Sequence, residues 1–216
     1  VKRILTLKVE RGIVKHEKPL PIDDIVANAS KVVGSKAHKQ VEAEAANRSI
    51  TLIKNKNALP FNFSNEEKIV VIGNTYIESL YHSVTSYHEN TELIKASEPF
   101  NNDQLVQLED ASALVVGTYT FDVSGRDPSS AQMQMVNQLI EQVDVPVIGV
   151  GIRNPYDIMA FPEIDAYVAQ YGFRDASFQA TAATLFGENR PTGLLPVSIP
   201  NSNGDVLFQY GHGLSY

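Results

Sequence analysis

Apolar and polar positions follow two alternating patterns along most of this chain. Short, nearly continuous apolar runs predict strands that are covered on both faces of a sheet. Between these runs, apolar residues spaced three or four positions apart predict amphipathic helices. The expected strands cover residues 49–54, 68–72, 92–96, 113–118, 146–152, 166–170 and 194–199. The expected helices cover residues 38–48, 76–86, 103–109 (with Asn102 as its cap), 129–142, 156–161 and 175–186.

This alternation of strands and helices predicts the fold class. Strands that are separated by helices favour parallel pairing through right-handed crossovers. We therefore expect an α/β fold, a three-layer α/β sandwich with a mainly parallel sheet of about six strands. Ligands of such sheets bind beyond the carboxyl ends of the strands. The loops at those ends are residues 73–76, 96–102, 119–128, 153–156 and 171–176.

The first 36 residues depart from this pattern. Within residues 1–12, Ile4, Leu5, Leu7 and Val9 are apolar but have no partner nearby in the sequence, so we interpret this segment as the end of a helix from a preceding domain. Residues 13–36 are polar and contain two prolines, which is typical of an interdomain linker or a wrapping arm. We expect one compact domain over residues 37–216. The chain starts at Val1 rather than at a Met, so it is either a fragment or a stand-alone domain.

Composition and charge exclude several classes of function. The formal net charge is −7, which argues against a nucleic-acid partner because phosphate binding requires a basic face. The chain has no cysteine, so disulfides, thiolate metal sites and cysteine catalysis are excluded. No apolar run reaches about 18 residues, so we expect no membrane-spanning segment.

No motif for a metal or a cofactor is complete. His82 and His88 are six positions apart, which is not the spacing that places two ligands on one helix face. The Gly149-Val150-Gly151 run resembles part of a dinucleotide fingerprint, but it lacks the third glycine and lies within an apolar run, so we assign it a packing role. We expect neither a metal nor a cofactor.

The loop at residues 119–128 is the strongest candidate for ligand binding. It follows an expected buried strand and combines carboxylates, a guanidinium and aromatic rings. Such side chains bind sugars, because they hydrogen-bond hydroxyl groups and cover the apolar faces of the ring. The alternative is a solvated loop in which Asp127 or Ser129 caps the next helix. The candidate sugar contacts in this loop are Asp122, Ser124 and Arg126.

Two further arginines follow other expected strands. Arg153 and Arg174 are candidate substrate contacts for this reason. The alternative is that these segments only begin helices, with Pro155 in a first turn and Asp175 as a cap or first-turn acid. We assign no catalytic residue in this chain, because no pair of catalytic carboxylates can be identified.

The closing segment resembles a known family. A helix ends in LFG at residues 185–187, PTGLLP follows at 191–196, and the chain ends in YGHGLSY at 210–216. Residues 46–61 read ANRSITLIKNKNALPF. Together these motifs resemble the C-terminal domain of glycoside hydrolase family 3, over roughly residues 38–216. The resemblance implies a retaining β-glycosidase whose nucleophile lies in an N-terminal barrel outside this chain. The implied partners are that barrel and a carbohydrate.

Two branches of this family differ in the source of the catalytic acid. In the β-glucosidase branch the acid is a Glu in the loop that corresponds to residues 119–128, three residues before a Gly. At that position this chain has Asp122, before Gly125. Bacterial β-N-acetylglucosaminidases instead use an Asp-His pair in a barrel loop. Asp is one methylene shorter than Glu and its neighbours match poorly, so the resemblance favours the second branch. Asp122 is then at most a substrate contact or a lid residue.

The favoured branch implies a bacterial parent, secreted or associated with the cell envelope, that removes N-acetylglucosamine from peptidoglycan fragments. One alternative is a β-glucosidase-type domain in which Asp122 is a shortened acid. The other is a stand-alone, non-catalytic binding module.

Overall fold

The computed structural model describes residues 1–14, 21–201 and 203–216. These residues form two compact units, Val1–Val41 and Glu42–Tyr216. The first unit contains α1 (Lys2–Glu10) and α2 (Ile22–Val32), and the helix α3 (Lys36–Ser49) runs from it into the second unit. The second unit contains every strand of the described chain.

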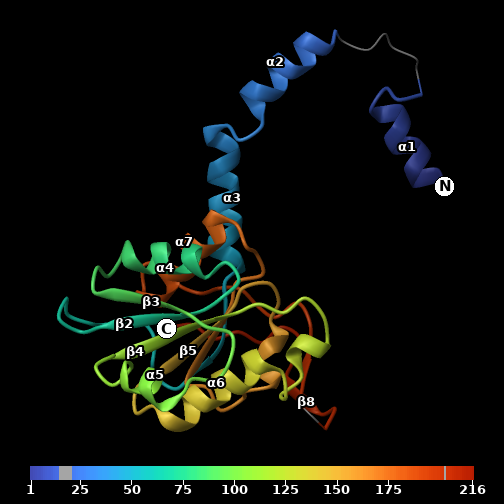
Figure 1. The fold of residues 1–216 in the computed structure, drawn as a ribbon. Coiled ribbons are helices and arrows are strands. Elements are labelled where there is room, and N and C mark those ends of the chain that lie inside the picture. The colour runs from blue at the N-terminus through green and yellow to red at the C-terminus, as the bar shows by residue number, and fades with distance from the viewer. Residues whose placement is uncertain (15–20, 202) are drawn as a thin grey trace. The chain divides into compact units, whose positions relative to one another are not determined.

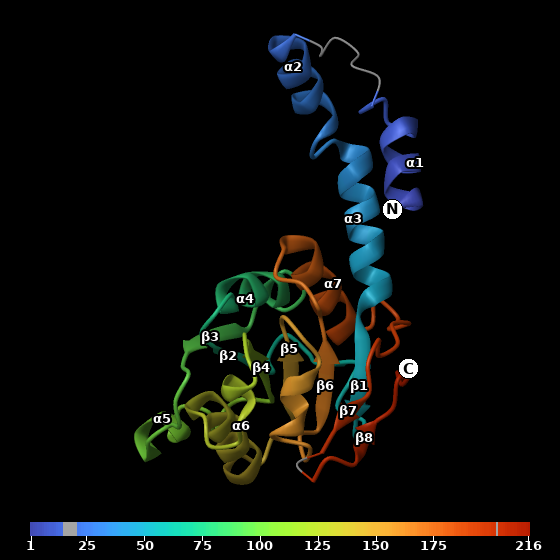
Figure 2. The same cartoon turned by 90° about the vertical axis from the view of Figure 1, so that its right-hand side faces the viewer.

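Six strands form the main sheet of the second unit, in the order β1-β6-β5-β4-β2-β3 (Figures 1 and 2). Five of them are parallel, and β1 runs antiparallel to β6 at one edge. The mainly parallel sheet of about six strands is thereby confirmed. The strands are β1 (Thr51–Asn55), β2 (Ile69–Gly73), β3 (Thr91–Lys95), β4 (Ala113–Thr118), β5 (Val147–Gly151) and β6 (Ala166–Ala169).

Helices cover both faces of this sheet, as the continuous apolar strands require. On one face α4 and α7 pack against it, and on the other face α5 and α6 do so together with the short helix η2 (Figure 1). Every residue of β2, β4, β5 and β6 is buried, because these strands are covered on both sides. The helices are α4 (Ile77–Thr85), α5 (Asn102–Val106), α6 (Ala131–Gln142), α7 (Asp175–Leu185), and the 3₁₀ turns η1 (Ser124–Arg126) and η2 (Tyr156–Met159).

The strand expected at residues 194–199 is wrong. Only the last of these residues is in a strand, β7 (Ile199–Pro200), which pairs with β8 (Val206–Phe208) in a separate two-stranded sheet. Pro196 has no N–H to donate, so an extended ladder cannot run through this segment. The segment instead bonds to residues near the chain end, where the Leu195 N–H donates to the His212 carbonyl at 2.8 Å and the Gly211 N–H donates to the Leu195 carbonyl at 2.9 Å.

Within the segment interpreted as a linker, residues 13–36, the helix α2 occupies Ile22–Val32. Pro21 suits the start of a helix, and Asp23 and Asp24 in the first turn interact favourably with the helix dipole. Residues 15–20 lie outside the described part of the chain. A smaller correction concerns α5, whose cap is Asn101 rather than Asn102, in a capping box closed by Gln104.

Two glycines of β5 accommodate the ring of Tyr167 on the neighbouring strand β6. A Cβ atom on Gly149 would lie 2.6 Å from the Tyr167 ring, and a Cβ on Gly151 would lie 2.3 Å from its hydroxyl oxygen. Tyr167 is itself fully buried, so the ring has little room to move. These contacts agree with the packing role expected for the Gly149-Val150-Gly151 run.

The replacement Gly151→Ala should therefore destabilise the fold. We expect a loss of about 1–3 kcal/mol in the free energy of unfolding, the usual cost of overpacking a core, measured by chemical denaturation. Gly125→Ala is the matched control, because its added Cβ would meet nothing closer than 3.5 Å. The loss at Gly151 should shrink in a Tyr167→Phe background, since the closest atom is then absent. Equal unfolding free energies for the two single variants would contradict this account of β5.

Candidate functional site

The carboxyl edge of the sheet carries the candidate site. Because β2, β4, β5 and β6 are parallel, the loops after them emerge at the same edge. The loop at residues 119–128 leaves β4 at this edge, as expected. The loops after β2, β5 and β6 contribute Tyr76, Arg153 and Phe173 respectively.

Three aromatic side chains from three of these loops form a cluster, here called the aromatic rim: Tyr76, Tyr119 and Phe173. The rings of Tyr76 and Phe173 stack with centroids 5.1 Å apart, and Tyr119 meets Tyr76 edge-on at 5.4 Å. The exposed fractions of Tyr76 and Phe173 are 42% and 37%. Tyr76 has a φ of 60°, a left-handed conformation that is uncommon outside glycine. The rim therefore presents aromatic surface of the kind that packs against sugar rings.

Each of the three predicted arginines lies over an aromatic ring. The Arg153 guanidinium carbon is 4.1 Å from the centroid of Phe121, and its Nη1 donates to the Tyr119 hydroxyl at 3.3 Å. Arg174 lies over Phe173 at 5.6 Å and Arg126 lies over Tyr156 at 5.0 Å. Such cation–π contacts orient a guanidinium while leaving its N–H donors available.

The predicted carboxylate Asp122 forms a turn within its own loop. Its Oδ1 accepts hydrogen bonds from the Ser124 hydroxyl at 2.7 Å and from the Gly125 N–H at 3.0 Å. These two bonds, the Ser124 hydroxyl first, hold the pKa of Asp122 below its ordinary value. The Arg126 Nε donates to the Asp122 carbonyl at 3.3 Å, so the structure brings Asp122, Ser124 and Arg126 together.

The alternative in which Asp127 or Ser129 caps α6 is wrong. The cap residue is Ser130, whose side chain makes no capping bond. Asp127 instead accepts from the Ser129 hydroxyl at 2.6 Å and from its N–H at 2.9 Å, which lowers the pKa of Asp127. Both side chains are therefore used in a turn that precedes the helix. Asp175 lies in the first turn of α7, as one of its two interpretations expected.

Asp157, which the sequence analysis did not identify, joins two loops of the site. It is fully buried in η2, and its two oxygens accept from the hydroxyls of Thr118 at 2.7 Å and Thr120 at 2.5 Å. The Asn154 amide in turn donates to the Thr120 hydroxyl at 3.0 Å and to its carbonyl at 3.1 Å. The start of the 119–128 loop is thus fixed to the loop after β5. The sequence signal that could have identified Asp157 is that it is the lone acid among the apolar residues 156–161.

Burial raises the pKa of Asp157 above its ordinary value. The hydroxyls of Thr120 and Thr118 and the charge of Arg126 act in the opposite direction, but more weakly. Asp122 and Asp127 are exposed and have lowered pKa values, whereas the raised pKa belongs to a carboxyl that is closed off from solvent. None of these three carboxyls combines a raised pKa with access to solvent.

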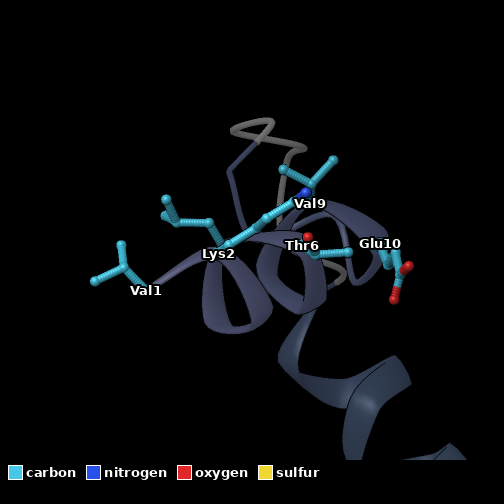
Figure 3. A pocket seen from close by; sticks show the side chains of 6 residues that line it. Val1, Lys2, Thr6, Val9 and Glu10 are labelled. Atoms are coloured by element: carbon cyan, nitrogen blue, oxygen red, sulfur yellow. The ribbon is translucent and has the colours of Figure 1, made fainter.

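The described part of the chain also has hollows away from this edge, and one of them is lined by residues of α5 and of the turn after α6, among them Leu105 and Val143. No group of three His, Cys, Asp or Glu side chains could hold a metal ion among residues 1–14, 21–201 and 203–216. No helix of those residues is long and apolar enough to cross a membrane. A hollow on α1 is lined by side chains of Val1 and of that one helix, Lys2, Leu5, Thr6, Val9 and Glu10 (Figure 3). A surface made by a single helix cannot enclose a ligand.

Comparison with known proteins identifies the relatives of this fold. The model of a family described as "Glycosyl hydrolase family 3 C-terminal domain" matches residues 50–216. A Formosa agariphila protein that carries the name of a beta-xylosidase is 26% identical over 97% of this chain. The "Lysosomal beta glucosidase" of Dictyostelium discoideum is 24% identical over the whole chain. The chain spans about a third of these two relatives, 32% and 34% of their lengths.

Solved structures give the same fold. A fungal multi-domain family 3 beta-N-acetylglucosaminidase has a TM-score of 0.69 and 28% identity, covering 81% of this chain and 20% of that one. The beta-glucosidase from Listeria innocua, solved with gluconolactone, has a TM-score of 0.73 over 99% of this chain and 38% of that one. Its identity is 16%, so this second likeness concerns the fold alone.

The raised pKa of Asp157 predicts a distinct pH dependence of stability. The native state holds this proton more tightly than the unfolded state, so its contribution is complete below pH 3.8 and is lost as the pH rises through the native pKa. The unfolding free energy of the wild type relative to Asp157→Asn should thus fall with rising pH, by at most about 1.4 kcal/mol per unit.

Asp127→Asn is the control for this titration and should show the opposite sign. Its lowered pKa gives a contribution that is present above pH 3.8 and is lost as the pH falls through the native value. Denaturation curves over a pH series measure both differences. Parallel pH profiles for the two variants would show that burial does not control Asp157.

Proposed function

The chain belongs to the glycosyl hydrolase family 3 C-terminal domain family, and from this premise we propose that it is the second domain of a retaining β-glycosidase. In this proposal the nucleophile lies in an N-terminal barrel outside the chain. The carboxyl edge of the sheet forms one wall of the substrate cleft and contacts the carbohydrate.

The carrying observation is that the described part of this edge holds arginines and aromatic rings, which are groups of the kind that bind sugars, without a pair of carboxyls that could act as catalysts. A retaining glycosidase needs two carboxyl groups about 5–5.5 Å apart, and the acid needs a raised pKa. Asp122 and Asp127 have lowered pKa values and are used in turns of their own loop. Asp157 has the raised pKa, but it is buried beneath Thr118 and Thr120. The aromatic rim and the arginines remain available for binding.

We propose β-linked N-acetylglucosamine as the sugar, released from peptidoglycan fragments by a secreted or envelope-associated bacterial parent. The likeness to a beta-N-acetylglucosaminidase at 28% identity supports the sugar. The turn made by Asp122 supports it too, because an ionised side chain of this kind is a poor proton donor. The names of the two curated relatives favour a second candidate, a β-glucosidase or β-xylosidase type of parent in which Asp122 is the acid.

We also propose that residues 1–36 are the end of the barrel and the interdomain linker. Neither α1 nor α2 has a buried residue, although both carry apolar side chains. Ile4, Leu5 and Val9 are each more than half exposed. Such helices gain stability by packing on another domain. The reading frame upstream of Val1 tests this point, because the proposal requires an adjoining barrel there.

The purified chain alone should hydrolyse no aryl glycoside. The reason is that neither a pair of catalytic carboxyls nor an Asp-His pair can be assigned to it. The measurement is release of nitrophenol from the N-acetylglucosaminide, the glucoside and the xyloside. Turnover that is abolished by a point mutation within the chain would overturn the proposal.

Replacing Asp122 by Asn in the full-length parent should lower the rate by a factor that does not depend on the leaving group. A lost charged substrate hydrogen bond costs about 1.5–3 kcal/mol, or roughly 10- to 150-fold. Loss of a general acid costs about 10²–10⁴-fold, and most for poor leaving groups. The assay compares kcat/KM for aryl glycosides with good and poor leaving groups.

Asp127→Asn is the matched control, since Asp127 is exposed and forms a similar turn in the same loop. It should change kcat/KM little for every substrate. A large loss for Asp122→Asn that is confined to poor leaving groups and rescued by azide would identify Asp122 as the acid. The second candidate function would then replace the first.

A further inference from the structure

We propose that Arg153 binds an anionic substituent of the glycan, so that the domain selects an acidic sugar beside the one that is cleaved. This inference rests on the proposed function, because it assigns a substrate feature to the same cleft wall. The chemical class is a sugar carrying a carboxylate or a sulfate ester. Both groups present two or more oxygens that a guanidinium can bind side by side.

Arg153 has no acidic partner within the described part of the chain. Among the described residues, ion pairs are made by Arg48, Lys56, Lys68 and Lys95, and none of these pairs involves Arg153. Arg153 is half-buried, and a guanidinium that is partly removed from water is costly to leave without a counter-ion. An anionic ligand is therefore the simplest partner for it.

Most N–H donors of the Arg153 guanidinium have no acceptor in the described part of the protein. Within the described chain the Arg153 guanidinium makes one hydrogen bond, from Nη1 to the Tyr119 hydroxyl at 3.3 Å. A guanidinium has several N–H donors, and no acceptor in this part of the chain engages the rest. Those donors are left for a ligand.

Two neighbouring aromatic rings orient the Arg153 guanidinium. The guanidinium carbon lies 4.1 Å from the Phe121 centroid and 5.8 Å from that of Tyr119. The start of the Phe121 loop is fixed through Thr120 to Asp157 and Asn154. Two rings therefore hold the guanidinium, and an oriented guanidinium is suited to bidentate recognition of an oxyanion.

The surrounding charges favour the same ligand. Arg126 and Arg174 also lack an ion pair within the described chain and lie over rings of loops at this edge. The net charge of the whole chain is −7, so unpaired arginines at this edge oppose the overall charge. A long polyanion such as a nucleic acid would be repelled by the rest of the surface, whereas one acidic sugar would meet only this edge.

The test is equilibrium binding to the full 216-residue chain, followed by NMR titration. The probes are methyl glucuronide, N-acetylglucosamine 6-sulfate and neutral N-acetylglucosamine. The wild type should bind at least one acidic probe more tightly than the neutral one. Arg153→Gln should weaken that probe about 10- to 150-fold, as for a lost charged hydrogen bond, and the neutral sugar much less. The two acidic probes separate a carboxylate from a sulfate ligand.

Two further variants make this result specific. Arg48→Gln removes the same charge from α3, where Arg48 pairs only with Glu44, and should leave all three affinities unchanged. Arg153→Lys keeps the charge but loses the planar fork, so it should retain part of the preference for the acidic probe. The Lys variant also provides a measurement if Arg153→Gln does not fold, which circular dichroism would reveal.

Three results would overturn the inference. Equal affinities for acidic and neutral probes would remove the anion specificity and leave sugar binding by the domain intact. An acidic probe that Arg153→Gln and Arg153→Lys bind as tightly as the wild type would place the anion elsewhere. No binding of any probe would reject both the anion site and a sugar-contacting edge, and the hydrolysis assays on the parent would still test the family function separately.

Discussion

The arrangement of the carboxyl edge depends on one buried carboxyl group, that of Asp157. Burying a carboxyl is costly unless hydrogen bonds compensate, and here the hydroxyls of Thr118 and Thr120 supply them. These two threonines flank Tyr119, so the group that satisfies Asp157 also determines how the long loop leaves β4. Asn154 closes the network from the other side by donating to Thr120. The buried Asp157 carboxyl, which no ligand can reach, therefore positions the loop residues that a ligand can reach.

This arrangement separates positioning from chemistry. The carboxylates that a substrate could reach keep lowered pKa values, because hydroxyl and amide donors of their own loop stabilise the charged form. The side chains left at the surface of the edge are arginines and aromatic rings, which bind and orient without transferring a proton. Under the proposed function, such a domain influences the reaction of its parent through the substrate that it binds.

Much of the fold could be predicted from the sequence, because buried parallel strands are written as continuous apolar runs such as residues 68–72 and 113–118. The strand expected at residues 194–199 was wrong because a single residue overrides the pattern. Pro196 interrupts an otherwise strand-like run, and only Ile199 of this run belongs to a strand. Here the backbone chemistry of proline outweighed the composition of the segment.

The candidate site was less accessible to sequence reasoning. Arg153 was expected at this edge, but its contact with Phe121 joins loops that follow different strands, and no local pattern encodes such a pairing. Asp157 was missed because a buried acid gives no periodic signal and is recognised only by its partners, which lie 37 and 39 positions away. The informative motifs are at the end of the chain, in residues 191–196 and 210–216. The second of these motifs pairs with the edge strand β1. The Leu214 N–H donates to the Leu52 carbonyl at 2.8 Å there.

Under the proposed function, a domain that supplies no catalytic acid can still determine what its parent cleaves. Binding energy from parts of the substrate that do not react can be used to orient the bond that does, and well-oriented groups account for several kcal/mol of a barrier. The Arg153 guanidinium lies over two rings of one loop whose start is fixed through Asp157, so little side-chain freedom is left to lose when a ligand binds. Under the proposed function, rigidity at the carboxyl edge is the property through which this domain contributes to specificity. The buried Asp157 network provides that rigidity.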